Sequence, residues 1–545
     1  MSKIKIFGMG GLDENGKNTY IVEVDNKIFI FDAGLKYAND SNFGIDYIIP
    51  DYKYLVDNRK RIVGVFVTHA HPESYGGVSD LIKNIPEIKV YGLKYTINQL
   101  ILDGVSEKNL HVLMPHKKIN FTKELSIFPI TVNHSVPDSC MYVLNTPDGA
   151  IVYTGDFIID PSMMGAYHMD LGKIAYVGKQ GVLALLGESS FAENIGHTSP
   201  NHHLSSFFKK LIAKTDGRII FSVLPVHLYT IEGIFNAAKN SHRKVVVMGK
   251  KLQNIINMAI KENYINIEEG QIGDLSNVND HNSILLISDD RSNAYNMFER
   301  IIAGNDKFIK LNEHDTVCFA EPKYDENEKA FVKVENELAI KGINTVSIPK
   351  DKGISLHASS EDIMIMLDLL KPKYYMPVKG EYRYMVRNAD LATNLGYNNN
   401  NIILKQNGDI INIIDKELVD KMEHINIDDT LIDGNSIEDI GDLVLKDREV
   451  LSENGIVLVS ATLSKKDKKI LVGPEITTRG FIYVKDSKEM IDEIKRISSE
   501  VIENNTTDKY IDFNNIKNDI RERLGKYFYV ETECKPMIIA VIQEI

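Results

Sequence analysis

The alternation of apolar and polar positions predicts strands and tight turns over roughly the first 200 residues. Tyr20–Val24 and Lys27–Phe31 flank Asp25-Asn26, a pair typical of a hairpin turn. Two further apolar runs, Arg61–Val67 and Ile151–Thr154, are expected to be buried strands that end in polar residues. Polar side chains at strand ends above a hydrophobic sheet are a usual way to hold a functional site rigidly.

From about Arg218 onward, strand-like runs alternate with helix-like runs. This βαβ rhythm predicts a parallel sheet covered by helices, inserted as a separate domain into the first one. The runs are Arg218–Leu224, Thr230–Asn240, Lys244–Met248, Leu252–Glu262, Ser283–Ser288, Asn293–Ala303, Asp315–Ala320, Glu326–Lys341 and Thr345–Pro349.

After the insertion, Ser359–Leu370 predicts an amphipathic helix, because its apolar residues recur at helical spacing behind a serine N-cap. The strand Tyr374–Val378 is expected next. The last hundred or so residues predict a small α/β unit, with strands over Gly455–Leu463 and Phe481–Val484 and a helix over Met490–Val501.

These patterns place the first domain in residues 1–207 together with 352–425, and the inserted domain in 208–351. An acidic linker is expected over 426–444, and a C-terminal domain over 445–545. A chain of 545 residues is too long for one hydrophobic core, which agrees with several domains.

Composition indicates the compartment and the kinds of partner to expect, but it does not indicate an activity. The formal net charge of -13 is evidence against a generic nucleic-acid coat, although a local basic channel stays open. Three cysteines, Cys140, Cys318 and Cys534, lie far apart in the sequence and suggest free thiols in a reducing compartment. Neither a signal peptide nor a membrane-spanning apolar run is seen. A soluble, cytoplasmic protein without membrane partners is expected.

The candidate chemistry is a set of histidines and a carboxylate at strand ends. His69 and His71 follow a predicted buried strand and precede Gly76-Gly77, and His134 and Asp156 follow later in the chain. Three neutral imidazoles and a carboxylate could hold one divalent ion, with Zn²⁺ or Mn²⁺ expected. Such an ion would lower the pKa of a bound water to about 7. The alternative is that each histidine is an ordinary polar or buried residue.

In the order of its motifs, the chain resembles the ribonuclease J family of β-CASP metallo-β-lactamase RNA nucleases. The resemblance covers essentially the whole length and includes a specific C-terminal match without catalytic residues. The motifs are Gly10-Gly11, Gly16-Lys17-Asn18, Asp32-Ala33-Gly34, Gly44-Ile45-Asp46, His69-x-His71, His134, Asp156, His357-Ala358-Ser359, Pro377-Val378-Lys379-Gly380-Glu381, Gly473-Pro474-Glu475-Ile476, Arg479-Gly480-Phe481-Ile482-Tyr483-Val484 and Lys535-Pro536-Met537-Ile538.

The resemblance implies an α/β architecture in three parts. These are a metallo-β-lactamase αββα sandwich, an inserted β-CASP α/β domain and a small C-terminal α/β domain that serves association. It also implies RNA hydrolysis at two metals, with 5′→3′ exonuclease and some endonuclease activity.

Site residues carry over from the family one by one. His69, His71 and His134 match the ligands of the first metal, and Asp156 matches the bridging carboxylate. Asp156, Glu188 and His357 are the expected catalytic residues. Glu188 stands where the family has an aspartate, and His357 matches a histidine near the scissile phosphate. The segment Gly353, Ile354, Ser355, Leu356 and His357 is expected to bind substrate, although it lacks the family's leading histidine and the glycine before His357.

The chain departs from the family at the second metal. The family's ligands there are an Asp, a His and a distant His, whereas this chain has Glu73, Ser74 and Lys379. Serine is a poor neutral ligand, and a lysine ammonium repels a metal. All three changes lead away from metal binding. The sequence therefore predicts a degenerate second site and at most one Zn or Mn ion per chain, or none.

The family's glycine-rich phosphate-binding stretch is altered as well. It is Asp289-Asp290-Arg291-Ser292-Asn293 here. Two carboxylates would repel a 5′ phosphate, and Arg291 would offset them only in part.

Two interpretations of Lys379 stay open at this point. Its ammonium could occupy the space of the missing second cation and pair with Glu73 and Asp156. Alternatively, it points to solvent.

The sequence leaves three functions open. The favoured one is a weakly active or inactive subunit in RNA processing and decay that pairs with an active ribonuclease J paralogue through the C-terminal domain. The second is an active nuclease with a single metal, and the third is a fold recruited for RNA or ribosome binding. A homo- or hetero-oligomer with RNA as its substrate or ligand is expected.

Overall fold

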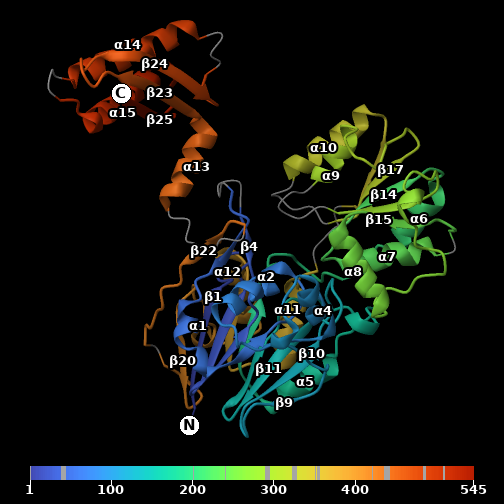
Figure 1. Ribbon diagram of the computed structural model, residues 1–545. Coiled ribbons are helices and arrows are strands. Elements are labelled where there is room, and N and C mark those ends of the chain that lie inside the picture. The colour runs from blue at the N-terminus through green and yellow to red at the C-terminus, as the bar shows by residue number, and fades with distance from the viewer. Residues whose placement is uncertain are drawn as a thin grey trace. The chain divides into compact units, whose positions relative to one another are not determined.

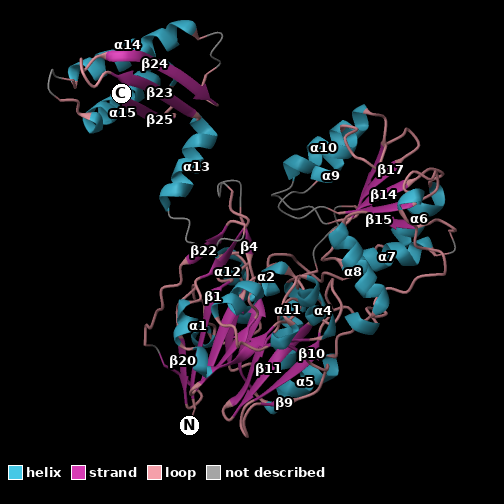
Figure 2. Ribbon diagram, viewed as in Figure 1, coloured by secondary structure: helices cyan, strands magenta, loops and turns pink. Residues whose placement is uncertain are grey.

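Two β-sheets face each other in the computed structural model (Figure 1; Figure 2). The eight-stranded sheet has the order β21-β20-β1-β2-β3-β6-β7-β8, and the six-stranded sheet has the order β19-β13-β12-β11-β10-β9. The first contains β1 (Lys3–Gly10), β2 (Thr19–Val24), β3 (Lys27–Phe31), β6 (Ile62–Phe66), β7 (Val90–Gly92), β8 (Leu110–Val112), β20 (Ile411–Ile414) and β21 (Glu417–Val419). The second contains β9 (Ile119–Asn120), β10 (Ser126–Thr131), β11 (Cys140–Thr146), β12 (Gly149–Tyr153), β13 (Val182–Glu188) and β19 (Tyr374–Val378).

The structure describes most of the chain. The described residues are 2–38, 44–199, 202–239, 241–288, 295–321, 328–349, 352, 356–419, 421–434, 442–482, 487–506 and 510–545. The expected phosphate-binding stretch 289–293 and residues Gly353, Ile354 and Ser355 lie outside them.

The main core lies between the two sheets, where aromatic residues such as Phe31 and Tyr142 pack with ring centroids 6.1 Å apart. A second core joins the outer face of the six-stranded sheet to α5 (Leu171–Gln180), α11 (Ser360–Leu370) and α12 (Tyr382–Asn394). On the outer face of the other sheet, Phe7 packs against Tyr54. Tyr54 belongs to α1 (Lys53–Asp57), and the next helices along the chain are α2 (Pro72–Tyr75), α3 (Val78–Asn84) and α4 (Lys94–Leu102). The αββα sandwich implied by the family resemblance is therefore confirmed.

The inserted domain is a five-stranded parallel sheet with the order β15-β16-β14-β17-β18. Helices α9 and α10 share its core on one face, and Phe208 of α6 packs on Phe221 at 5.6 Å on the other. The elements are α6 (Ser205–Lys214), β14 (Ile219–Ser222), α7 (Leu228–Ala238), β15 (Val245–Val247), α8 (Lys250–Lys261), β16 (Ile284–Ile287), α9 (Asn296–Ile302), β17 (Thr316–Phe319), α10 (Glu328–Ile340) and β18 (Asn344–Ser347).

Contacts divide the chain into two compact units, 1–37 with 47–430 and 38–46 with 431–545. In the second unit, β23 pairs antiparallel with β24 and parallel with β25, and two long helices cover this sheet. Its helices and strands are α13 (Asp442–Asn454), β23 (Ile456–Leu463), β24 (Ile470–Arg479), α14 (Lys488–Asn504), α15 (Phe513–Thr532) and β25 (Met537–Glu544). The small sheet β22-β5-β4 comprises β4 (Lys36–Tyr37), β5 (Tyr47–Pro50) and β22 (Asp429–Ile432).

One predicted strand is wrong over its described part. The sequence predicts a strand over Phe481–Val484, but β24 ends at Arg479, and Gly480 with φ 69° turns the chain. Phe481 then packs on Phe528 of α15, with ring centroids 4.8 Å apart. The apolar run reflects this contact with the helix layer. Residues 483 and 484 lie outside the described part of the chain.

The stretch expected to be a linker, 426–444, contains β22 and the first residues of α13. Among the described residues, no helix combines the length and the apolar character that crossing a membrane requires.

Candidate metal centre

The loops that carry the candidate site are held together by backbone contacts. His69 and His71 lie between β6 and α2, and Pro72 at the first turn of α2 ends this loop. The neighbouring loop approaches so closely that a Cβ atom on Gly34 would lie 1.7 Å from the carbonyl oxygen of Glu73. Only glycine fits there, which accounts for the glycine of the Asp32-Ala33-Gly34 motif.

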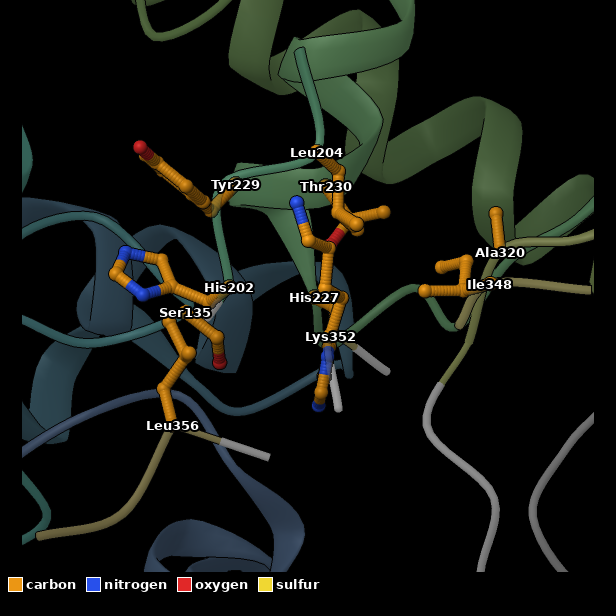
Figure 3. Close-up of a pocket in the computed structure, with 10 residues that line it drawn as sticks. All are labelled: Ser135, His202, Leu204, His227, Tyr229, Thr230, Ala320, Ile348, Lys352 and Leu356. Atoms are coloured by element: carbon orange, nitrogen blue, oxygen red, sulfur yellow. The ribbon is translucent and has the colours of Figure 1, made fainter. Parts of the chain in front are cut away.

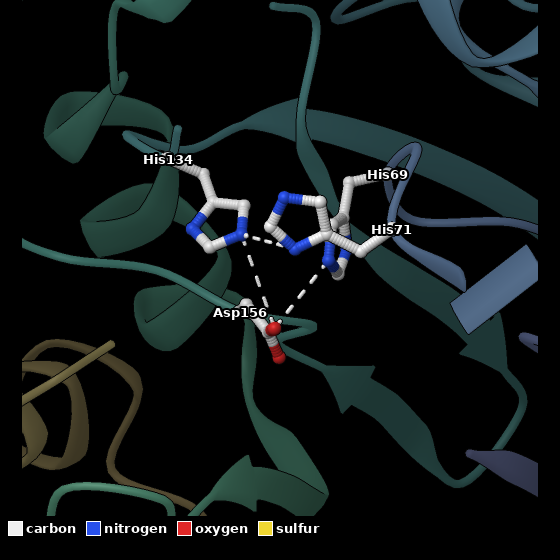
Figure 4. Close-up of side chains that lie close together, drawn as sticks. All are labelled: His69, His71, His134 and Asp156. Carbon is white, nitrogen blue, oxygen red and sulfur yellow. Dashed lines mark hydrogen bonds and ion pairs between the residues drawn. The ribbon is translucent and has the colours of Figure 1, made fainter. Parts of the chain in front are cut away.

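Three imidazoles and one carboxylate converge in the buried space above the sheets (Figure 4). His71 Nδ1 lies 3.2 Å from His134 Nε2, and His69 Nε2 lies 3.4 Å from Asp156 Oδ2. His134 Nε2 is 3.9 Å from the same oxygen. Ligands bound tetrahedrally at about 2.0–2.1 Å from zinc are themselves about 3.3 Å apart. These spacings therefore fit one divalent ion.

The opposite nitrogen of each ring has its own contact. His134 Nδ1 bonds the carbonyl oxygen of Leu356 at 2.8 Å, and His71 Nε2 bonds that of Val226 at 2.9 Å. His69 Nδ1 contacts the Thr68 hydroxyl at 2.9 Å. In His71 and His134 the carbonyl must accept the ring proton, so the inner nitrogen keeps its lone pair. Within the described part of the chain, His69 Nε2 has no hydrogen-bond partner, which also fits a metal.

Burial controls the protonation of these rings. It lowers the pKa of His71 to about 3 and holds the pKa of His134 well below its ordinary value, with neighbouring imidazoles acting in the same direction. Both rings are neutral at pH 7. Neutral imidazole is the form that binds a metal.

Lys379 approaches the same carboxylate from the other side. It follows β19 in a left-handed backbone conformation with φ 63°, and its amide donates to the carbonyl of Gly11 at 2.9 Å. Its side chain is 2% exposed, and its ammonium forms a hydrogen bond and ion pair with Asp156 Oδ2. Solvent exposure of Lys379, one of the two interpretations left open by the sequence, is therefore excluded.

Lys379 and Asp156 each oppose the pKa shift that burial would cause in the other. Burial alone would raise the pKa of Asp156, but the ammonium of Lys379 and the nearby imidazoles hold it well below its usual range. For Lys379, burial would lower the pKa, but Asp156, Glu73 and Glu188 raise it. Both groups are therefore charged at neutral pH.

The other two residues at the expected degenerate site lie on α2. Glu73 Oε1 is 3.8 Å from His71 Nδ1. Ser74 is fully buried, and its hydroxyl makes no hydrogen bond to the described residues. The structure thus brings Glu73 to His71 and Lys379 to Asp156, at the edge of one histidine cluster.

Glu188 and His357 form a hydrogen-bonded pair beside the histidine cluster. Glu188 Oε2 bonds His357 Nδ1 at 2.9 Å, while its Oε1 accepts from the amides of Phe157 and Ala358. Burial would lower the pKa of His357, but Glu188 and Asp156 raise it. Since His357 Nδ1 is also 3.6 Å from Asp156 Oδ2, the Glu188–His357 pair lies next to the ion pair between Lys379 and Asp156.

Two positioning residues were given no role by the sequence interpretation, which named Asp32 only as part of the Asp32-Ala33-Gly34 motif. Asp32 accepts hydrogen bonds from the Thr68 amide at 2.7 Å and from the Tyr153 hydroxyl at 2.8 Å. Burial raises the pKa of Asp32 to about 6. Ser135 lies 3.0 Å from His71 Nε2. The position of Asp32 directly after a strand was the available signal, whereas nothing in the sequence pattern singled out Ser135.

A pocket near the histidine cluster is lined by residues of the sandwich and of the inserted domain (Figure 3). Ser135 connects the two, because it contacts His71 and also lines the pocket. Lys352 brings a cation to this pocket. The lining residues are Ser135, His202, Leu204, His227, Tyr229, Thr230, Ala320, Ile348, Lys352 and Leu356.

The pKa of His71 makes the stability of the metal-free protein depend on pH. Its value is about 3 in the folded protein against an ordinary 6.5, so below pH 6.5 the unfolded chain takes up a proton that the folded protein does not. The corresponding stability is present above pH 6.5 and is lost as the pH falls toward 3. When the pH is lowered from 7 to 5, the free energy of unfolding of His71→Gln should fall by about 2 kcal/mol less than that of the wild type. Urea unfolding in EDTA measures this difference, and parallel pH profiles would contradict it.

Comparison with known proteins agrees with this geometry. Residues 12–163 match the metallo-beta-lactamase superfamily, and residues 350–403 match the Zn-dependent metallo-hydrolase RNA specificity domain. A crystal structure of a protein of unknown function from Enterococcus faecalis V583 has a TM-score of 0.52 at 17% identity and covers 75% of this chain and all of that chain. That likeness concerns the fold alone. The fold and the histidine cluster are those of the metallo-β-lactamase superfamily.

Four further matches identify the family. Residues 216–338 match the ribonuclease J beta-CASP domain, and residues 443–545 match the ribonuclease J C-terminal domain. Ribonuclease J 2 of Staphylococcus epidermidis (strain ATCC 35984) is 33% identical over 552 residues, which cover 99% of this chain and 98% of that protein. Ribonuclease J 2 of Staphylococcus aureus (strain MRSA252) is 33% identical over 550 residues with the same coverage. The chain belongs to the ribonuclease J family of RNA nucleases.

Proposed function

We propose that this chain is a ribonuclease J-type subunit with a degenerate second metal site, with weak or no nuclease activity of its own. It would contribute to RNA processing and decay as the partner of an active paralogue. The single observation that carries this proposal is the buried ion pair between Lys379 and Asp156. The carboxylate that the family uses to bridge two metals is here shared between a histidine cluster and an ammonium.

Electrostatics argue against a metal beside Lys379. At an effective dielectric of about 20, a divalent cation about 4 Å from an ammonium is repelled by roughly 8 kcal/mol. The serine hydroxyl of Ser74 offers no charge to compensate. We therefore propose at most one ion, zinc or manganese, or none. His69, His71, His134 and Asp156 would hold it, and it would share the Asp156 carboxylate with the ammonium of Lys379. When bound, it would supply an activated water.

The family's reaction is expected to suffer from this loss. Two metals normally stabilise both the attacking and the leaving oxygens of an in-line displacement, and each contributes several kcal/mol. Because every 1.36 kcal/mol changes a rate tenfold, one missing ion should slow hydrolysis by orders of magnitude. Asp156, Glu188 and His357 remain the proposed catalytic residues for any residual activity, with the segment 353–357 as the proposed RNA-binding segment.

A single-metal nuclease is the second candidate. The convergent nitrogens of the three histidines and the intact Glu188–His357 pair favour it. The two candidates differ in whether the chain alone hydrolyses RNA.

Degradation of 5′-monophosphorylated RNA by the pure protein separates them. We expect a rate indistinguishable from that of Asp156→Ala, or at least about 100-fold below that of an active paralogue under the same conditions. Clear activity that disappears in Asp156→Ala would establish the single-metal nuclease instead. A second readout is the metal content lost in His69→Ala/His134→Ala, which should be at most one equivalent per chain. Loss of two equivalents would contradict the degenerate site.

The role as partner subunit requires a separate measurement. The second compact unit has its own sheet and helix layer, and it matches the ribonuclease J C-terminal domain, which supports an association function. Mixing the full-length chain with an active ribonuclease J paralogue should give a joint species in size-exclusion chromatography. Independent elution at micromolar concentrations would refute the pairing.

A further inference from the structure

A second group of metal-type ligands lies outside the site described above. It consists of Asp160, His202 and His203, and it shares no residue with the His69 cluster. Asp160 belongs to the loop after β12 of the sandwich, whereas the two histidines directly precede α6, the first helix of the inserted domain. The group therefore joins the two domains of the first compact unit where the chain passes from one to the other.

Asp160 is held in place as a ligand would be. Its Oδ1 accepts hydrogen bonds from the amide and the hydroxyl of Ser162 at 2.8 and 2.7 Å, and its own amide donates to Asn133 Oδ1 at 2.9 Å. Its other oxygen, Oδ2, faces His202 Nε2 at 3.0 Å and His203 Nε2 at 2.7 Å. Outer hydrogen bonds that orient a carboxylate toward imidazoles are typical of metal sites.

His202 is a buried imidazole whose polar contacts are incomplete. Its side chain is 4% exposed, and among the described residues its Nδ1 has no hydrogen-bond partner, while its Nε2 meets Asp160 Oδ2 at 3.0 Å without the geometry of a hydrogen bond. A hydrogen bond between His203 and Asp160 alone would explain those two residues. It would leave His202 unsatisfied, and a buried unsatisfied polar group needs an explanation.

We propose that Asp160, His202 and His203 bind a divalent transition-metal ion, with zinc as the best match. Two imidazoles, a carboxylate and one position open to water form a typical zinc ligand set. Ligand atoms on zinc lie about 3.3 Å apart, so the three atoms must separate by a few tenths of an ångström. The ring of His203 allows this movement, because 38% of its side chain is exposed.

The ion would connect the sandwich to the start of the inserted domain. His202 also lines the pocket between these domains, next to Leu204 and Tyr229 (Figure 3). The ion would thus lie at one side of that pocket and hold the segment before α6 against the loop after β12. This structural role does not depend on nuclease activity in the His69 site.

Zinc content of the full-length chain tests the proposal. The wild type, His202→Ala and His203→Ala are loaded with ZnCl₂, dialysed and analysed for zinc and protein. His197→Ala is the matched control, because His197 lies in the same connecting region and bonds a buried carboxylate, Asp362, at 2.8 Å without a second histidine. We expect both test variants to hold one equivalent less than the wild type and the control. Equal zinc content in all four proteins would overturn the proposal.

Two further measurements distinguish loss of the zinc site from a folding defect. His203 is partly exposed, so His203→Ala should keep the native circular dichroism even if the buried His202→Ala does not. Zinc should also raise the Tm of the wild type and of His197→Ala, and raise that of His203→Ala by a smaller amount. A zinc-induced shift of the same size in natively folded His203→Ala would show that zinc binds elsewhere and would refute the site.

Discussion

The combined replacement Glu73→Asp, Ser74→His and Lys379→His is expected to raise the rate of RNA hydrolysis at least about 100-fold. The ammonium of Lys379 contacts the carboxylate that the family uses as its bridge, and the two α2 residues lie beside the same histidine cluster. The replacements remove a cation and supply two imidazoles and a shorter carboxylate at those positions. A second Lewis acid contributes several kcal/mol, and about 2.7 kcal/mol corresponds to a hundredfold change in rate.

The experiment requires two matched controls. Lys379→His alone removes the ammonium but leaves Ser74 without a ligand group, so it should gain little activity. Adding Asp156→Ala to the triple replacement should abolish the gain. The triple variant should also bind one more equivalent of metal than the wild type, measured after identical loading. A second ion bound without faster hydrolysis would show that the proposed weak activity has another cause, with the altered stretch 289–293 as the next candidate.

The fold could be predicted well because its signals are local. Lys27–Phe31 and Tyr374–Val378 form strands over the predicted bounds, and the helix predicted to end at Leu370 does so. In each case the apolar positions follow the period of the element, and Ser359 forms the expected N-cap. Two predictions are wrong. The first 200 residues are expected to form strands and turns, but they also contain helices such as α4 and α5. Phe481 is apolar because it packs on a helix, and pattern alone does not distinguish that contact from a strand.

The residues of the site could be predicted from the sequence, but the directions of their side chains could not. His69, His71, His134 and Asp156 follow strand ends, so their convergence could be expected from sequence. The direction of Lys379 could not, because it depends on a left-handed backbone conformation and on a hydrogen bond to Gly11, far away in the sequence. The Asp160–His202–His203 group was missed for a similar reason. It unites two loops whose proximity follows from the packing of the inserted domain.

Replacement of Lys379 by methionine is expected to destabilise the metal-free protein by about 3–5 kcal/mol. Methionine preserves much of the volume but leaves the buried carboxylate of Asp156 without its strongest counter-charge. Removing one partner of a buried ion pair typically costs that much, because the other charge stays buried. Urea unfolding in EDTA at pH 7 measures the loss. A change below about 1 kcal/mol would show that Asp156 is stabilised without Lys379.

A double-mutant cycle separates the ion pair from simple packing. Asp156→Asn removes the charge that Lys379→Met leaves unpaired, so the double variant should be more stable than the sum of the two single effects predicts. Zinc provides an independent test, because a cation bound by the three histidines can compensate Asp156 once the ammonium is absent. Zinc should therefore stabilise Lys379→Met more than the wild type. Equal stabilisation would mean that Lys379 and the metal do not compete for the carboxylate, and the interpretation of Lys379 as a built-in replacement for the second cation would fail.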